Sequence, residues 1–259
     1  MRRSFRSSEP PACSRKRTTV RNIDFHSHIL PGMDDGAENA EISAGQLTRL
    51  KKQGVDRVFL TSHFDFRRET PENFIKRRQS AYERLMEVYD ADTMPEVFTG
   101  AEIYMARGIG ELDYSGLELQ YTDTYLIEFP REPFGTWMFD LIETLLFERK
   151  MRVMIAHVNR VTAAYKKDIC GSLFDYSGLV FQLNCEAFHG LFVSDPLKGY
   201  NVSDLRFVIG TDTHDLEKRA PDYDVALKKL ASGRLSYLRE SIMHNNERFN
   251  KRIDKKLQG

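Results

Sequence analysis

The sequence predicts an α/β fold, a single distorted seven-stranded (βα)7 barrel of the TIM-like type. Its 259 residues match the size of an α/β barrel built as one domain. From residue 22 onward, short apolar runs alternate with longer amphipathic stretches, which is typical of a parallel sheet covered by helices. No internal repeat or long linker interrupts residues 22–259. We therefore expect one barrel domain, at 22–259, that ends in a helix.

Seven strands alternate with six helices in this prediction. The strands are 22–26, 55–61, 96–101, 124–129, 152–156, 178–183 and 206–210. Helices are expected to begin near Asn39, Thr70, Phe134, Thr162 and Pro221, and a last one to run from 235 to about 253. The second helix places a cap residue, Thr70, before a proline. Its apolar residues recur at helical spacing: Phe74, Ala81, Leu85 and Val88.

The net charge of zero hides two parts of opposite sign. Residues 1–21 hold seven of the 38 basic residues and one of the 38 acidic ones, so residues 22–259 keep 31 basic against 37 acidic. We expect residues 1–21 to be a disordered basic tail, with a transit peptide or a misassigned start as alternatives. Such a tail can contact phosphates without reading a base sequence. No specific nucleic-acid partner is therefore predicted.

Cysteine usage and hydropathy predict a cytoplasmic protein. The three cysteines, Cys13, Cys170 and Cys185, are odd in number and widely spaced, which fits a reducing compartment better than a disulfide framework. No apolar run approaches the roughly 18 to 20 residues that span a bilayer, and no apolar segment follows the basic N-terminus. Membrane insertion and secretion are not expected.

Metal-binding side chains follow six of the seven predicted strands. They are His26 and His28, His63, Glu102, Glu128, His157, and Asp212 with His214. The carboxyl ends of barrel strands converge on one rim, so these residues are expected to be neighbours. A single histidine in such a place is more often a hydrogen-bonded core residue. Because five of the seven histidines belong to this set, with His189 and His244 outside it, the joint pattern predicts a metal centre.

The donor types narrow the choice of ion. His26 and His28 lie on one face of an extended segment, because side chains alternate along a strand. Imidazoles mixed with carboxylates suit Zn, Fe or Mn, and the lack of cysteine argues against a closed structural zinc site. The loop that follows adds Asp34 and Asp35. An Asp-Asp-Gly sequence fits a turn as well as a ligand, but its position favours a ligand role for at least one of the two.

Two arginines indicate phosphate chemistry. Arg160 lies three residues beyond His157, and Arg219 lies five beyond His214. A guanidinium group binds phosphate through two hydrogen bonds, and paired metal ions assist phosphoryl transfer to water. No P-loop or GxGxxG motif occurs, and no cysteine is followed by arginine six positions later. A phosphatase reaction here would therefore depend on metal.

The motifs resemble the PHP (polymerase and histidinol phosphatase) superfamily, and within it the capsule-associated phosphatases of the CpsB/CapC type. The most specific segment is 24–37, DFHSHILPGMDDGA. The motifs TSH (61–63), GAEIY (100–104), LIEFP (126–130), IAH (155–157) and DTH (212–214) follow in family order. The resemblance spans about residues 23–252.

The resemblance implies a seven-stranded PHP barrel with a trinuclear metal site. Manganese is the expected ion, with Fe, Zn, Co or Mg as alternatives. By motif, the implied ligands are His26, His28, Asp35, His63, Glu102, His157, Asp212 and His214. The implied phosphate-binding catalytic residues are Arg160 and Arg219.

The chain departs from the family pattern in three places. Phe64 stands where many relatives have a second histidine, and Asn159 replaces the glutamate of the usual His-x-Glu-Arg motif. Because asparagine lacks the negative charge of glutamate, we expect the groups that surround the metal ligands to differ from those of the family. The loop at 185–190 does not align, and His189 within it fits either a substrate contact or no role.

We predict a metal-dependent protein-tyrosine phosphatase without a catalytic cysteine. The implied partner is a phosphotyrosine protein, the Tyr-rich tail of a bacterial tyrosine kinase that regulates capsular or exopolysaccharide synthesis. An alternative within the superfamily is a phosphatase for a small metabolite such as histidinol phosphate. An alternative of another class is a non-catalytic metal-binding docking module.

Overall fold

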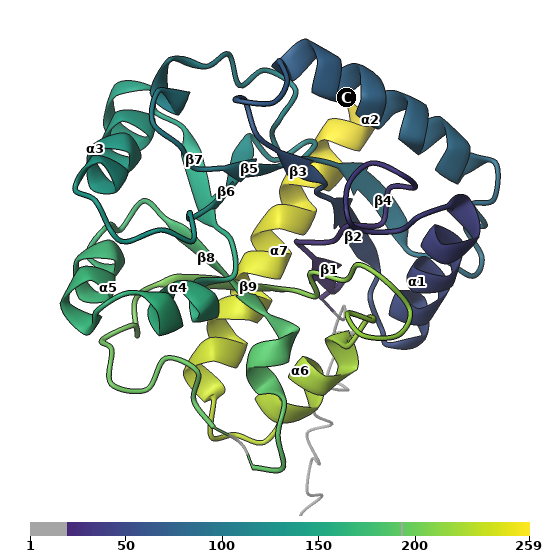
Figure 1. The fold of residues 1–259 in the computed structure, drawn as a ribbon. Helices are drawn as coiled ribbons and strands as arrows, with labels where there is room; N and C mark the ends of the chain where they lie inside the picture. The colour runs from purple at the N-terminus through teal and green to yellow at the C-terminus, as the bar shows by residue number, and fades with distance from the viewer. Residues whose placement is uncertain (1–19, 193) are drawn as a thin grey trace, which may run out of the picture.

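Strands and helices alternate along the chain, as the sequence predicts (Figure 1). The computed structural model describes residues 20–192 and 194–259, so nearly all of the predicted tail lies outside it. The strands are β1 (Ile23–Asp24), β2 (Arg57–Leu60), β3 (His63–Phe64), β4 (Glu96–Thr99), β5 (Glu102–Tyr104), β6 (Thr124–Glu128), β7 (Arg152–Ile155), β8 (Val180–Asn184) and β9 (Arg206–Gly210). The helices are α1 (Ala40–Lys52), α2 (Pro71–Met86), α3 (Trp137–Glu143), α4 (Val158–Ala164), α5 (Lys167–Phe174), α6 (Tyr223–Leu230) and α7 (Ser236–Gln258).

The strands form two parallel sheets. One has the order β1-β2-β4, and the other has the order β3-β5-β6-β7-β8-β9. The backbone N–H of Phe25 donates to the carbonyl of Ile209 over 3.2 Å, and Ser27 forms a parallel bridge with Thr213. The chain is thus an α/β domain with parallel sheets, and the edge strands β1 and β9 are neighbours.

Two predicted strands are followed by a further short strand. β2 lies within the segment predicted at 55–61, and β3 follows it after Thr61 and Ser62; β4 lies within the segment predicted at 96–101, and β5 follows it. The N–H of Glu102 is shared between the carbonyls of Thr61 (3.2 Å) and Ser62 (3.1 Å). Two residues opposite one have the form of a β-bulge, a device common beside active sites. The first predicted strand, 22–26, is also shorter, since only Ile23–Asp24 is paired as β1.

Helix starts were predictable where a side chain caps them. Asn39 accepts the N–H of Ile42 at the start of α1, and Thr70 accepts that of Asn73 at the start of α2. The starts near Phe134 and Thr162 are wrong, because α3 begins at Trp137 and α4 at Val158. Neither has a side-chain cap, so the capping signal that locates α1 and α2 is missing there.

The helix ends differ from the prediction as well. Val88 lies beyond α2 and is exposed, so it does not belong to the buried face of that helix. The C-terminal helix α7 continues to Gln258, past the expected end near 253. A π-helical turn at Thr144–Glu148 extends α3.

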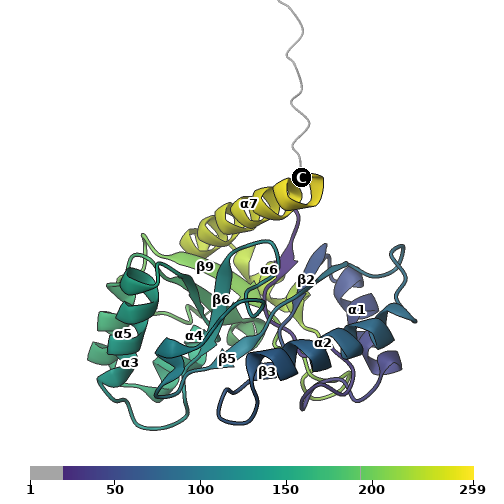
Figure 2. The same ribbon diagram turned by 90° about the horizontal axis from the view of Figure 1, so that it is seen from above.

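The long helix α7 closes one end of the strands. Figure 2 shows it lying across that end, with the other helices to the sides. A buried cluster joins Phe249 and Ile253 of α7 to strand residues, and the Phe249 ring meets Phe25 edge-on at 4.8 Å. Buried Arg57 adds ion pairs to Asp254 of α7 (2.6 Å) and to Glu96 (2.9 Å). None of the helices in the described ranges has both the length and the hydropathy that a bilayer crossing requires.

Candidate metal centre

The carboxyl ends of the strands bring the predicted ligands together. His26 and His28 follow β1, His63 begins β3, Glu102 begins β5, Glu128 ends β6, His157 follows β7, and Asp212 and His214 follow β9. All except His63 are buried. Three overlapping sets have ligand atoms within 4.8 Å of one another: His28, Asp35, His63 and His214; His26, His28 and Glu102; His63, Glu102 and Glu128. His157 and Asp212 border these sets.

Glu102 lies at the middle of the cluster. Its Oε2 is 3.2 Å from Nε2 of His26, 3.3 Å from Nε2 of His28 and 2.9 Å from Nδ1 of His63. Its Oε1 lies 3.0 Å from Nε2 of His157. One carboxylate thus contacts four imidazoles from three segments: the stretch after β1, β3 itself, and the residue after β7.

Outer partners orient three of the histidines. Nδ1 of His28 faces Asp34 Oδ2 at 2.9 Å, and Nδ1 of His26 faces Gln182 Oε1 at 3.1 Å. Nδ1 of His214 faces the carbonyl of Asp212 at 2.9 Å. With the proton on Nδ1 in each case, the Nε2 lone pair is directed at the cluster, which is how metal-binding histidines are commonly held.

Buried donor atoms without partners fit divalent ions. Nε2 of His214 and Oε2 of Glu102 are buried and make no hydrogen bond in the described part of the chain. An unsatisfied buried polar atom is costly, and a cation would satisfy both. The mixture of imidazole and carboxylate donors suits Mn, Fe or Zn, so the residues present fit the implied metals.

Asp212 joins the metal-binding cluster to the two predicted arginines. Its Oδ1 lies 3.3 Å from Nε2 of His28. Its Oδ2 contacts Arg160 at 2.8 Å and Arg219 at 2.9 Å. Glu186 also accepts from Nε of Arg160 at 2.7 Å. Both guanidinium groups are therefore held beside the cluster and remain partly accessible.

Backbone strain accompanies the site. His157 has φ of 31° and Asp212 has φ of 53°, in the left-handed region that side chains other than glycine seldom adopt. The N–H of His157 donates to Gln182 Oε1 at 2.6 Å, and the N–H of Asp212 donates to the His26 carbonyl at 2.7 Å. Strain of this kind persists only where surrounding contacts hold it, and it is concentrated at functional sites.

The charges of the cluster shift its pKa values in opposite directions. Burial raises the pKa of Glu102, but the charge of His26 and the hydrogen bond from His157 outweigh it and hold that pKa well below its usual range. Burial lowers the pKa of His157, but its hydrogen bonds with Glu102 and Glu128 raise it to about 9. Burial and the charge of His28 lower the pKa of His214 to about 4. The Glu102 carboxylate is thus ionised and ready to bind a cation.

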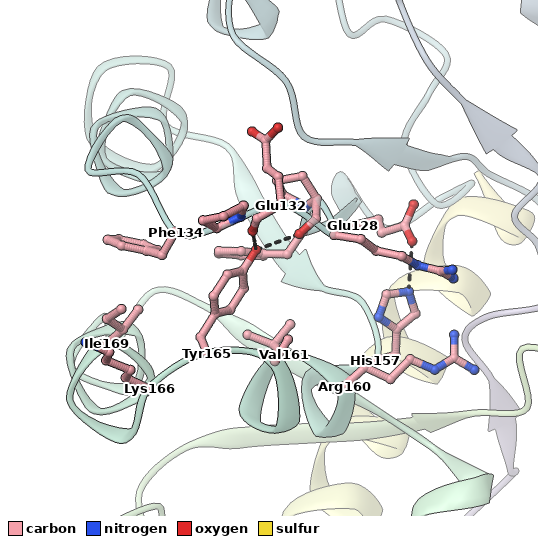
Figure 3. Close-up of a pocket in the computed structure, with 14 residues that line it drawn as sticks. Glu128, Glu132, Phe134, His157, Arg160, Val161, Tyr165, Lys166 and Ile169 are labelled. Atoms are coloured by element: carbon pink, nitrogen blue, oxygen red, sulfur yellow. Dashed lines mark hydrogen bonds and ion pairs between the residues drawn. The ribbon is translucent and has the colours of Figure 1, made fainter.

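An apolar pocket of about 680 Å³ opens beside the cluster (Figure 3). Its polar end holds Glu128, His157 and Arg160, and its apolar wall includes Phe134 and Val161. The Tyr165 hydroxyl donates to the carbonyls of Pro130 and Glu132, so it ties the end of α4 to the loop after β6. This contact fixes the two walls relative to each other.

Comparison with known proteins assigns the family. The model of the family described as capsular polysaccharide synthesis, CpsB/CapC, matches residues 22–249. The chain belongs to the CpsB/CapC family. It is 29% identical over 230 residues to the tyrosine-protein phosphatase CpsB of Streptococcus pneumoniae, with 80% of this chain and 90% of that protein covered.

A solved CpsB/CapC-type structure has the same fold. The match comes from the crystal structures of YwqE from Bacillus subtilis and CpsB from Streptococcus pneumoniae, described as unique metal-dependent tyrosine phosphatases. The TM-score is 0.68 at 24% identity, and the match covers 89% of this chain and 94% of that chain. The predicted resemblance to the family is confirmed.

Some residues of this CpsB/CapC site were missed or under-weighted by sequence reasoning. The sequence places Glu128 at the rim, but the family resemblance does not include it among the implied ligands. In the structure it belongs to one of the three groups of donor atoms, with His63 and Glu102. Gln182 and Asn184 were not considered; Gln182 Nε2 donates to Asn184 Oδ1, and Asn184 Nδ2 donates to Asp212 Oδ2. The sequence did contain a signal for them. Gln182 and Asn184 are polar, lie two residues apart, and stand in β8, whose other residues are apolar and buried.

Asp34 and Asp35 have different positions in the site. Asp35 is exposed and joins the set with His63 and His214, each 3.4 Å from its Oδ1. Asp34 is turned inward, where it holds His28 and accepts the N–H of His63 at 2.9 Å. The structure therefore places Asp35 in the predicted ligand position and Asp34 behind a ligand.

The three departures from the family pattern lie outside the ligand sets. Phe64 is fully buried and packs edge-on against Phe74 at 5.1 Å. Asn159 Oδ1 accepts the N–H of Asn184 at 3.0 Å. His189 pairs with Asp222 at 2.7 Å.

Replacement of Glu102 by glutamine is expected to abolish metal binding at the centre of the site. Glutamine keeps the size but presents one neutral oxygen to four imidazoles. Manganese per chain, measured by elemental analysis after dialysis, should fall below the wild-type value. Because ligand present at a hundred times its Kd stabilises by about 2.7 kcal/mol, EDTA should lower the unfolding temperature of the wild type more than that of Glu102→Gln, which keeps the set without Glu102.

His189→Gln is the matched control for Glu102→Gln, since His189 lies outside the described ligand sets. It should bind as much manganese as the wild type. Equal metal content in Glu102→Gln and the wild type would contradict the assignment.

Proposed function

We propose that this CpsB/CapC protein is a metal-dependent protein-tyrosine phosphatase. The observation that carries the proposal is the position of Asp212, whose Oδ1 faces the histidine cluster while its Oδ2 holds Arg160 and Arg219. A phosphate bound there would meet metal ligands on one side and guanidinium groups on the other. The name of the Streptococcus pneumoniae relative, a tyrosine-protein phosphatase, supports the same reaction.

The proposed cofactor is a group of three divalent ions, with manganese first. The three overlapping donor sets support that number, and His26, His28, Asp35, His63, Glu102, Glu128, His157, Asp212 and His214 would hold the ions. Such ions supply Lewis-acid chemistry, which polarises the phosphoryl group and makes water a stronger nucleophile. Fe, Zn, Co and Mg are the alternatives.

The two arginines bind and orient the phosphate. Both contact one oxygen of Asp212, which holds their planes beside the cluster. Their remaining N–H groups can donate to the nonbridging oxygens, on which negative charge is concentrated during phosphoryl transfer. A phenolate leaving group, with a pKa of about 10, needs less help from a general acid than an alkoxide does.

The apolar pocket favours an aromatic substrate over a small metabolite. Its wall of Phe134, Val161 and Tyr165 begins next to Arg160 and His157, so a phenyl ring can pack there while its phosphate reaches the cluster (Figure 3). Aromatic rings gain from such contacts beyond the area that they bury. Histidinol phosphate and similar metabolites remain the second candidate class.

The proposed partner is the phosphorylated, Tyr-rich tail of a bacterial tyrosine kinase. The family description, capsular polysaccharide synthesis, supports this context. Buried Cys170 and Cys185 are free thiols, as expected in a reducing compartment, so we place the reaction in the cytoplasm. A non-catalytic docking role would leave the arrangement of Arg160 and Arg219 around Asp212 without a purpose.

We also propose that the two sheets form one distorted seven-stranded barrel. The inner apolar cluster takes one residue from each of seven strands: Ile23, Phe59, Phe98, Leu126, Met154, Val180 and Val208. The contacts of Phe25 with Ile209 and of Ser27 with Thr213 support closure between β1 and β9. In this description β2 with β3, and β4 with β5, are the halves of two bent strands.

Parallel assays test the function. Protein dialysed against a chelator should lose turnover of a phosphotyrosyl peptide, and Mn²⁺ should restore it. The value of kcat/KM should be at least tenfold higher for the peptide than for histidinol phosphate. Turnover that survives complete removal of metal, or a preference for the metabolite, would overturn the proposal.

The apolar pocket predicts a selective effect of Phe134→Ala. Loss of the ring contact should cost about 1–2 kcal/mol, a factor of about 5–30, in kcat/KM for the phosphotyrosyl peptide. Turnover of glycerol 3-phosphate, which has no ring, should be unchanged. Phe147→Ala is the control, because Phe147 is exposed and does not line the pocket. Equal losses on both substrates would argue against a ring site here.

A further inference from the structure

Four arginines line one pocket at the end of the strands opposite the metal centre. Arg152 and Arg206 are the first residues of β7 and β9, and Arg248 and Arg252 lie on α7. The pocket between them has a volume of about 130 Å³. It adjoins a second pocket of about 410 Å³, to which Arg206 and Arg248 also contribute.

The fold brings these four side chains together. β7 and β9 flank β8 in the sheet, so their first residues lie on either side of one strand. Arg248 and Arg252 are four residues apart and share one face of α7. Figure 2 shows α7 lying across this end of the molecule. No single segment of the sequence contains the cluster.

None of the four charges has a carboxylate partner in the described part of the chain. Within residues 20–192 and 194–259, no carboxylate lies within 4.0 Å of any of them. Arg252 alone donates a side-chain hydrogen bond, a long one of 3.5 Å to the Thr122 carbonyl. By contrast Arg57, also beside α7, pairs with Glu96 and Asp254 and donates to Asn250.

The cluster is electrostatically unfavourable by itself. Burial lowers the pKa of Arg206, and the charges of Arg248 and Arg152 lower it further. Burial and the other three arginines likewise lower the pKa of Arg252, partly offset by Asp123. Repulsion among like charges of this kind is relieved when an anion binds.

We propose that these four arginines form a binding site for a phosphate-bearing anion, separate from the metal centre. Guanidinium groups grip phosphate oxygens in pairs, and four of them suit a dianion or a diphosphate better than a carboxylate. Asp204 and Glu240 line the adjoining pocket without approaching the guanidinium groups, which leaves room there for the rest of a larger ligand.

The site is distant from the catalytic one. Arg206 begins β9 and Asp212 follows its other end, and the four steps of β9 alone span about 13 Å at roughly 3.3 Å per residue. A ligand of this size at the arginines therefore does not reach the metal-binding cluster, and its binding is independent of the proposed phosphatase reaction.

Equilibrium dialysis of the manganese-loaded full chain with radiolabelled inorganic phosphate tests the proposal. The double variant Arg206→Gln/Arg248→Gln should bind one equivalent less than the wild type, or bind it at least tenfold more weakly. Arg234→Gln, an exposed arginine outside both pockets, should bind as the wild type does. Phosphate uptake in the double variant equal to that of the wild type would overturn the proposal.

Two further readouts separate a binding role from a structural one. Without phosphate, the double variant should keep its manganese content and unfold at the same or a higher temperature, because like charges have been removed. A large drop in the unfolding temperature would instead indicate a structural role and contradict the proposal. Sedimentation with phosphatidic acid vesicles, against phosphatidylcholine vesicles, tells whether the phosphate comes from a lipid headgroup or from a free anion.

Discussion

The buried carboxylate of Glu102, with four imidazoles around it, is the contact on which the rest of the site depends. It is 1% exposed, and a carboxylate buried to this degree is costly unless it is paired. His157 pairs with Oε1, but Oε2 faces His26, His28 and His63 without a hydrogen bond, so a cation would complete the pairing. Gln182 and Asp34 orient two of these histidines from behind. The bulge at Thr61–Ser62 lies beside this contact, where the N–H of Glu102 is shared between two carbonyls.

Asp212 extends this arrangement toward substrate. Its strained backbone is held by His26 and its side chain by Asn184, Arg160 and Arg219. The residues of β8, which carries none of the predicted ligands, thereby determine the position of both arginines. In the proposed function, the apolar pocket beyond Arg160 selects among phosphate esters.

The clustering of the predicted ligands could be foreseen from sequence because carboxyl ends of parallel strands meet at one rim. That rule located His26, His63, His157 and Asp212 without knowledge of any contact. It could not find the bulge at Thr61–Ser62, because the switch of hydrogen-bond partners there depends on neighbouring strands. Nor could it separate Asp34 from Asp35, since adjacent residues in a loop can turn either way.

Other features depend on tertiary packing alone. The starts of α3 and α4 lack capping side chains, so only packing determines them. The arginine cluster combines Arg152 and Arg206 with Arg248 and Arg252, and nothing in the sequence shows that α7 crosses the start of these strands.

Anomalous diffraction at the manganese absorption edge, from crystals grown with Mn²⁺, would locate any ions in the cluster. We expect three anomalous peaks there, among the donor atoms of Glu102, His28, His63 and Asp212. A cluster without any peak, or manganese bound only elsewhere on the protein, would contradict this expectation.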